Sequence, residues 1–556
     1  MVRKLFALLL VAFTASANEV SFHTIQSGWG SAATPLTDHG INGEGQIVAV
    51  LDTGVDYDSC YFVEADGSQP PANTGSPTAG LAWTNIDPSR RKIIAYDFLY
   101  SCDQYLGARG CENPSDPSAY DNTDHGTHAA AIAVGDFDRY GQHDYADGMA
   151  PAAKLIVQDG GFIGGDFCTQ RPGFGCPVNI TPILDQAYKQ GARIHSNSWG
   201  DRQGASPNQI TPTANYSTSA RDVDAFVYAH PDMLVVFDTG NWGTTTQVLP
   251  NPAPPMSLAA PGDAKNTIQV GGVRPPDRDD SVISWNTLFG PTRDGRIKPD
   301  VVGPATVLAG DWDWGSNIPN CNISTQGPGT SWSTPTIAGA AALVRQYYTD
   351  GFYPSGTRNA SDAMTPSAAL LKATIIAAAR QVPWRQTYTV DVAAKPVPSS
   401  EQGFGFPVLD DALYFPGDRA RLRVADMANA NGLAGGESTT LTVHAVAGTP
   451  LKAVLVWTDP PGVPRGVNDS TPELVNDLDL RVVAPSGAAS YPNGGTQPDR
   501  LNNVEVVSIP QPVTGTYTIT VSANHLGVGP RQGYALVMTG DFATTLPGRV
   551  RAVRAG

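Results

Sequence analysis

The sequence predicts an α/β part, with a parallel β-sheet and helices on both faces, followed by an all-β sandwich. Three observations support this fold class. Apolar runs that suit strands covered on both faces alternate with helical patterns from residue 47 to about residue 380. After about Asp411, short segments of alternating polarity are separated by Gly, Pro and Asn turns, which is typical of a sandwich. The 556 residues also exceed what one hydrophobic core usually holds.

In the α/β part, continuous apolar runs predict the strands and helical patterns predict the helices. The clearest strands are Ile47–Leu51, Leu155–Val157 and Met233–Phe237. The clearest helices are Pro182–Gln190 and Pro366–Arg380. A polar turn follows each strand, and such turns meet at the carboxyl edge of a parallel sheet. We therefore expect functional residues to gather at that edge.

Two further regions differ in composition from the α/β part. The segment from Tyr57 to Asn122 is polar and rich in Pro, Ser, Asp and Gly, so it is predicted to be a long surface insertion. In the β part, alternation is clearest at Thr440–His444, Ala453–Trp457 and Tyr517–Val521. The expected division is a signal segment, the α/β part containing the 57–122 insertion, the sandwich and a flexible basic tail: residues 1–17, 18–411, 412–544 and 545–556.

The first 17 residues carry the pattern of a secretory signal. Arg3 and Lys4 precede the apolar run Leu5–Phe13, and Ala15-Ser16-Ala17 supplies a cleavage site with small residues. The apolar run is too short to span a bilayer, and no later apolar stretch reaches about 20 residues. We therefore expect a secreted, extracellular protein without a membrane span; an ordinary N-terminal helix is the alternative.

Six cysteines fit an oxidising compartment, where disulfides persist. None lies in a Cys-x-x-Cys pair, which argues against zinc and redox motifs. Six cysteines allow 15 pairings, so connectivity stays open, with free thiols as a further alternative. The preferred pairs are Cys102–Cys111, Cys168–Cys176 and Cys60–Cys321.

The net charge of −16 argues against nucleic acid as a partner, because phosphate binding requires a basic face. The chain is expected to be a monomer.

Three local contexts could together supply nucleophilic catalysis. Ser331 precedes a run of small residues that opens with Pro335, so it is expected at a helix N-terminus, where amides favour negative charge. His125 also opens a small apolar run and could accept and return a proton near neutral pH. Asp52 ends the first strand and could hold the imidazole in the required tautomer. Taken singly, Ser331 could be an ordinary capping serine and Asp52 a turn aspartate. His128 follows His125 by one helical turn, but no Glu stands between them as in His-Glu-x-x-His, which argues against a zinc pair.

The combination of these contexts resembles the subtilase family. Asp-Thr-Gly at 52–54, His-Gly-Thr-His at 125–128 and Gly-Thr-Ser-Trp-Ser-Thr-Pro at 329–335 follow the family's order, and the similarity covers roughly residues 43–406. The resemblance implies a subtilisin-like sheet and a catalytic triad of Asp52, His125 and Ser331. It assigns the oxyanion-hole amide to Asn241. It assigns substrate binding to four residues: Ser198, Trp199, Gly200 and Gly240.

A closer likeness is to the oxidatively stable, KP-43-type subtilases. Residues 193–200 (Arg-Ile-His-Ser-Asn-Ser-Trp-Gly) and 474–480 (Leu-Val-Asn-Asp-Leu-Asp-Leu) carry it. It implies that the sandwich is a jelly roll. The family's chemistry requires no cofactor, although structural calcium is plausible by resemblance. Four oxygen-bearing side chains have suitable hardness, but turn residues facing water are an equal reading, so no ligand is assigned: Asp459, Asn476, Asp477 and Asp479.

The function expected from this resemblance is that of a secreted serine endopeptidase acting on extended or unfolded protein. Two alternatives stay open: a binding or adhesion protein built on a silent protease fold, and a dedicated processing peptidase with one natural substrate.

Overall fold

The large β-sheet organises the α/β part of the computed structural model, which describes residues 18–76, 80–81, 84–99, 125–137, 144–160, 179–200, 214–241, 253–274, 282–311, 321–386, 391–543 and 553–555. Its central strands are parallel neighbours in this order: β4 (Ile93–Phe98), β5 (Lys154–Asp159), β1 (Ile47–Asp52), β6 (Ile194–Asn197), β7 (Leu234–Asp238) and β8 (Ile268–Arg274). These strands confirm the three predicted runs. Because the runs are parallel, their polar turns share one edge.

Shorter strands complete the α/β part. Those that extend the large sheet are β2 (Ala72–Ser76), β3 (Gly80–Leu81), β9 (Val282–Ile283), β10 (Val301–Pro304), β14 (Trp384–Gln386) and β15 (Asp391–Ala393). Two small antiparallel pairs lie apart from it: β11 (Leu308–Gly310) with β12 (Ile323–Thr325), and β13 (Ala379–Arg380) with β16 (Phe406–Pro407).

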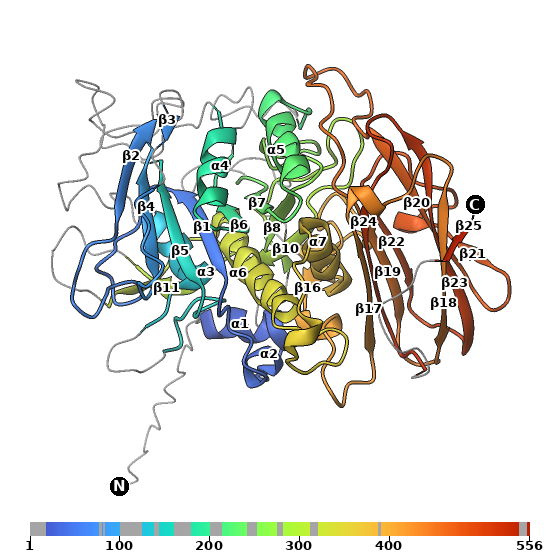
Figure 1. Cartoon of the computed structure of the whole chain (residues 1–556), viewed down its shortest axis with the longest axis horizontal. Coiled ribbons are helices and arrows are strands. Elements are labelled where there is room, and N and C mark those ends of the chain that lie inside the picture. The colour runs from blue at the N-terminus through green and yellow to red at the C-terminus, as the bar shows by residue number, and fades with distance from the viewer. Residues whose placement is uncertain are drawn as a thin grey trace, which may run out of the picture.

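Helices cover both faces of the sheet. They are α1 (Asn18–Ser27), α2 (Pro35–Asp38), α3 (His125–Val134), α4 (Thr181–Lys189), α5 (Thr218–Ala229), α6 (Thr330–Thr349) and α7 (Ala368–Ala377). In Figure 1, α4 and α5 lie above the central strands, α3 and α6 lie below them, and α7 lies between the sheet and the sandwich. The helices predicted from Pro182 and from Pro366 are thus confirmed as α4 and α7.

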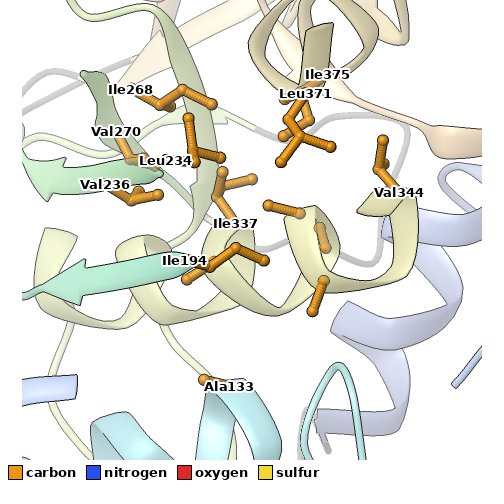
Figure 2. Packing of buried hydrophobic residues seen from close by; sticks show 14 of the residues in the cluster. Ala133, Ile194, Leu234, Val236, Ile268, Val270, Ile337, Val344, Leu371 and Ile375 are labelled. Carbon is orange, nitrogen blue, oxygen red and sulfur yellow. The ribbon is translucent and has the colours of Figure 1, made fainter. Parts of the chain in front are cut away.

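The core of the α/β part forms where α6 crosses the sheet. Figure 2 shows Ile337 of α6 among apolar side chains of β6, β7 and β8, and all of them are fully buried. Burying each such side chain contributes about 1.5–3 kcal/mol. The small residues of α6 allow close packing, since a Cβ at Gly339 would lie 2.6 Å from the carbonyl oxygen of Ala133 in α3.

The 57–122 segment was predicted to be a surface insertion, and this was wrong for part of it. Ile93–Phe98 forms β4, whose side chains are all buried and which pairs with β5. The polar composition around these residues conceals a short apolar strand.

The β part contains two facing sheets, which confirms the predicted sandwich. One sheet has the order β17 (Arg421–Met427), β24 (Tyr534–Gly540), β19 (Leu451–Val456), β22 (Val504–Ile509); the other has β21 (Ala489–Ser490), β20 (Asn476–Val483), β23 (Gly515–Leu526), β18 (Ser438–Ala445), β25 (Val553–Ala555). Apolar side chains of both sheets form one cluster. A jelly-roll connectivity stays a prediction. Part of the expected flexible tail was wrongly predicted, because β25 pairs with β18.

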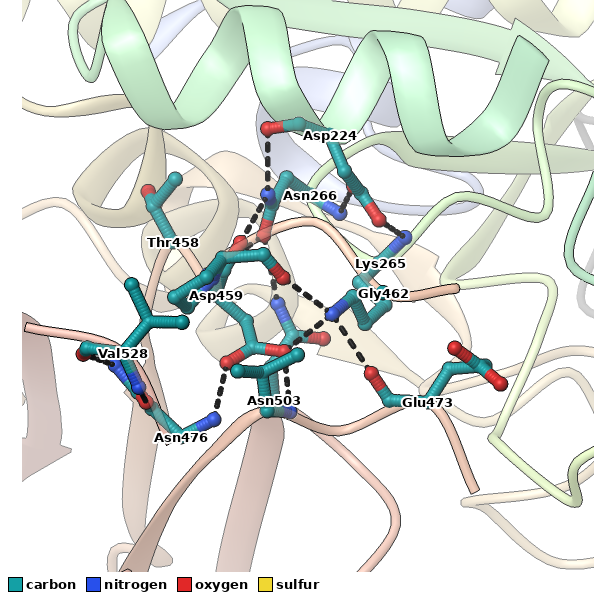
Figure 3. A network of polar contacts seen from close by, with 12 residues as sticks. Asp224, Lys265, Asn266, Thr458, Asp459, Gly462, Glu473, Asn476, Asn503 and Val528 are labelled. Atoms are coloured by element: carbon teal, nitrogen blue, oxygen red, sulfur yellow. Dashed lines mark hydrogen bonds and ion pairs between the residues drawn. The ribbon is translucent and has the colours of Figure 1, made fainter. Parts of the chain in front are cut away.

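The two parts are joined by a buried polar network (Figure 3). The ammonium of Lys265 contacts the carboxylate of Asp459 and donates hydrogen bonds to the carbonyl oxygens of Pro460 (2.6 Å) and Glu473 (2.8 Å). The neighbouring Asn266 side chain forms hydrogen bonds with both the backbone N–H and the carbonyl of Asp459, each at 2.9 Å. The β part is therefore attached through specific, fully desolvated contacts.

Candidate active site

Asp52 and His125 meet at the carboxyl edge of the large sheet. Asp52 ends β1 and His125 begins α3, and the His125 Nδ1 atom lies 2.7 Å from Asp52 Oδ1. The Asp52 side chain is 4% exposed, whereas that of His125 is 32% exposed. The carboxylate thus holds one ring nitrogen, while part of the imidazole remains exposed to solvent.

The segments around Asp52 and His125 also contact each other directly. The N–H of Gly126, in the first turn of α3, donates to Thr53 Oγ1 at 2.9 Å, which satisfies one of the donors that a helix start leaves free. A Cβ at Gly126 would lie only 2.0 Å from the carbonyl oxygen of Gly54. Glycine is therefore required there for α3 to bring His125 up to Asp52.

Ser331 lies in the first turn of α6, as predicted, and is mostly buried. Its neighbour Trp332 packs against the ring of His125, with 4.8 Å between ring centroids. This contact brings the serine-bearing turn beside the Asp52–His125 pair. The first N–H groups of a helix have no carbonyl partner within the helix. The N–H of Ser331 is one of them, so it is available to bind an anion.

Pro335 lies inside α6, beyond its first turn. Proline has no N–H, so the helical bond to the carbonyl of Ser331, four residues earlier, cannot form. The hydroxyl of Ser198 donates to this carbonyl instead, at 2.7 Å. This hydrogen bond connects Ser198, which follows β6, to Ser331, the candidate nucleophile.

Asn241 follows β7, and the oxygen of its side-chain amide accepts hydrogen bonds from neighbouring donors. The backbone N–H and the hydroxyl of Thr330 lie 2.9 Å and 3.2 Å from Asn241 Oδ1. Asn286 Nδ2 approaches the same oxygen at 3.3 Å. Because the oxygen is occupied, the NH₂ group is the end of the amide that remains to act as a donor next to Ser331.

Comparison with known proteins shows the family to which these motifs belong. The sequence profile of the subtilase family, Peptidase_S8, matches residues 43–405, which is well over half of the chain. The chain belongs to the subtilase family. Asp52, His125, Asn241 and Ser331 all lie within the matched residues.

Individual relatives match over different lengths. "Serine protease/ABC transporter B family protein tagA" of Dictyostelium discoideum is 26% identical over 95% of this chain and 32% of its own length. Subtilisin BL of Lederbergia lenta is 27% identical over 46% of this chain and 76% of its own length. The solved serine protease of Aeromonas sobria has a TM-score of 0.39 at 14% identity, covering 94% of this chain and 95% of its own. The chain spans about a third of the length of the first curated relatives it matches.

Two of the residues predicted to bind substrate in this subtilase, Gly200 and Gly240, pack closely against Ala259. A Cβ at Gly200 would lie 2.6 Å from Ala259 Cβ, and one at Gly240, where φ is +83°, would lie 3.1 Å from the same atom. Trp199 packs edge-on against Phe237, with centroids 5.4 Å apart. A side chain at either glycine would collide with Ala259, so the local packing requires glycine at both positions.

His128 is the second histidine of the subtilase motif, and it is fully buried. Its Nε2 lies 3.2 Å from the carbonyl oxygen of Val307, and its ring meets Trp332 edge-on. Burial lowers the pKa of His128 to about 4, so this histidine stays neutral at physiological pH. These contacts support a structural role under α6 rather than the zinc pair.

The candidate calcium ligands are engaged in other contacts. Asp459 faces Lys265, Asn476 bonds Gln532, and Asp477 and Asp479 both contact Arg500. Throughout the described ranges, no group of three or more His, Cys, Asp or Glu side chains is arranged to hold a metal ion. This donor set therefore does not fit a calcium ion in the observed arrangement.

One predicted disulfide is confirmed, Cys60–Cys321, which joins residues 261 positions apart. The other four cysteines lie outside the described residues, as does the signal segment. Among the helices that the structure describes, none has both the length and the apolar character that a membrane crossing requires.

Proposed function

We propose that this subtilase is a serine endopeptidase with Ser331 as nucleophile, His125 as general base and Asp52 as the residue that orients His125. The observation that carries the proposal is the 2.7 Å contact between His125 Nδ1 and Asp52 Oδ1. It occurs beside the helix turn that bears Ser331, because Trp332 packs on the same imidazole.

The reaction proceeds in two steps on these groups. Ser331 Oγ attacks the scissile carbonyl while His125 Nε2 takes its proton, and the imidazolium then protonates the leaving amine. A water molecule, activated by His125, hydrolyses the acyl-enzyme. The developing oxyanion is stabilised by Asn241 Nδ2 and the N–H of Ser331. One such donor stabilises the transition state by about 2.7–4 kcal/mol in a subtilisin.

The substrate is an extended segment of protein, from an unfolded chain or a flexible loop. Support comes from Ser198, Trp199 and Gly200, which follow the buried strand β6, and from the bond between Ser198 and the backbone of Ser331. A peptide in extended conformation can pair with such a segment through its main chain, and this places few demands on side chains.

We further propose that the protein is secreted. The Cys60–Cys321 disulfide supports this, since disulfides persist in oxidising compartments. The signal-like pattern of residues 1–17 supports it from the sequence.

Casein hydrolysis by the wild type and by Ser331→Ala tests the activity, together with labelling by a fluorophosphonate. Ser333→Ala is the matched control, because it lies in the same helix turn and donates only to the carbonyls of Gly303 and Pro304. Loss of cleavage and labelling in Ser331→Ala alone is expected. A folded wild type that neither cleaves nor labels would contradict the proposal and favour a binding role. Cleavage of one peptide but not casein would favour a dedicated processing enzyme.

A further inference from the structure

Asn286 lies between the candidate oxyanion-hole residue and the segment that leads into α6. Its Nδ2 atom is 3.3 Å from Asn241 Oδ1 and 2.5 Å from the carbonyl oxygen of Pro328, just before the helix cap Gly329. Asn286 is 4% exposed. The buried Asn286 amide thus contacts both Asn241 and the residues that precede α6.

The orientation of the Asn286 amide is itself fixed. Ser284 Oγ donates to Asn286 Oδ1 at 2.6 Å, and the carbonyl of Pro328 can only accept a hydrogen bond. If the Asn286 amide turned over, its oxygen would face the Pro328 carbonyl and that hydrogen bond would be lost, so the Pro328 carbonyl fixes the NH₂ group in place. Asn286 is an obligate donor toward Asn241.

The other donor side chain at Asn241 is not obligate. The hydroxyl of Thr330 also lies 3.2 Å from Asp238 Oδ2, and a hydroxyl can either donate or accept. If the Asn241 amide turned over, its NH₂ group would meet the NH₂ group of Asn286 and the backbone N–H of Thr330. Each buried donor left without an acceptor costs about 1–3 kcal/mol.

We infer that Asn286 is a positioning residue for the proposed peptidase: it holds Asn241 with its NH₂ group directed toward the oxyanion. This inference rests on the proposed function. Without Asn286, only the backbone N–H of Thr330 opposes the turned-over amide, which presents an oxygen where a donor is required. The transition state then loses stabilisation, whereas ground-state binding of the peptide is unaffected.

Steady-state kinetics of the full chain on a peptide substrate test the inference. Asn286→Ala should lower kcat about 10-fold to 100-fold with KM within about twofold, since loss of one oxyanion donor costs about 10²–10³ in kcat. Asn286→Asp keeps the size but cannot donate, so it should show the same loss. Asn73→Ala, which removes a buried amide from β2, controls for general destabilisation and should leave kcat unchanged.

A double-mutant cycle gives the decisive result. In an Asn241→Ala background, Asn286→Ala should lower kcat by less than about twofold, because residues that act through one another are not additive. A full, additive loss in that background would overturn the inference, as would an Asn286→Ala enzyme with wild-type kcat. A wild type without hydrolysis would instead refute the proposed function, so the two failures are distinguishable.

Discussion

The ammonium of Lys265 lies against the carboxylate of Asp459, and both side chains are fully buried where the α/β part meets the sandwich. The carboxylate also accepts the backbone N–H groups of Val475 (3.0 Å) and Asn476 (2.7 Å). Each charge is thus compensated and hydrogen-bonded, which is the condition for a buried pair to persist.

Asp459→Asn should destabilise the protein by about 3–5 kcal/mol, because it leaves the buried Lys265 ammonium without its counter-charge. Urea unfolding of the purified full chain measures this. The control is Asp541→Asn, which removes a surface partner of Arg419 and should cost less than about 1 kcal/mol. Equal effects of the two substitutions would contradict a special role of the buried pair.

Asp52→Asn should preserve the fold and lower kcat about 10⁴-fold, because the amide no longer selects the required imidazole tautomer. The hydrogen bond at His125 Nδ1 is the structural basis. Kinetics on a peptide substrate check the effect, with Asp87→Asn, at a half-buried carboxylate, as control. A loss below about tenfold would mean that Asp52 does not orient His125.

Gly126→Ala should abolish hydrolysis, because its Cβ would lie 2.0 Å from the Gly54 carbonyl oxygen and α3 would have to move away from Asp52. Gly327→Ala serves as the matched control: no atom lies within 4 Å of a Cβ there, and the carbonyl that accepts the Trp332 indole N–H is retained. Casein assays and circular dichroism separate lost activity from lost structure. Full activity in Gly126→Ala would show that the helix start tolerates displacement.

Replacing Cys60 and Cys321 together by serine should lower the free energy of unfolding by about 2–5 kcal/mol, because the disulfide closes a long loop in the unfolded chain. The two cysteines are 261 positions apart. In reducing buffer the wild type and the double variant should have equal stability, because neither then contains the Cys60–Cys321 bond. Equal stability in non-reducing buffer as well would argue against a stabilising disulfide.

The stability of the protein should depend on pH through Asp97. This carboxyl is buried, and burial raises its pKa to about 7, although the amides of Gln190 and Asn73 donate to it. Between pH 4 and pH 7 the folded state then binds more protons than the unfolded state, so the free energy of unfolding falls as pH rises. The slope from one group is at most about 1.4 kcal/mol per pH unit.

Asp97→Asn removes this contribution while it keeps the oxygen that accepts both amides. Relative to the wild type, the variant should gain stability from pH 4 to pH 7 and then show a constant difference. Thermal unfolding at a series of pH values measures it. Parallel curves for the two proteins would show that the folded-state pKa is not raised.

The sheet and the family were predictable because their signals are local. Asp52, His125 and Ser331 each stand in a short motif at the start or end of one element, so the sequence alone marks them. Strands such as Ile47–Asp52 are apolar nearly throughout, because both faces are covered. The Cys60–Cys321 pair is the one that remains when cysteines close together in the sequence are paired with each other.

Other features have no local signal. Asn286 contacts Asn241 and Pro328, which are 45 and 42 positions away, and its own segment carries no recognisable motif. Lys265 and Asp459 are 194 positions apart. Strand β4 was missed because its six residues lie inside a polar segment whose average composition indicates a loop.

Helix α7 belongs to both parts of the chain. All ten of its residues are buried, and it contacts α6 and β7 on one side and β19 and β24 on the other (Figure 1). A helix whose residues are all buried needs cover on every face. Protein engineers who wish to exchange the sandwich for another module must therefore rebuild an interior surface, and a cut near residue 411 would leave one side of α7 facing water.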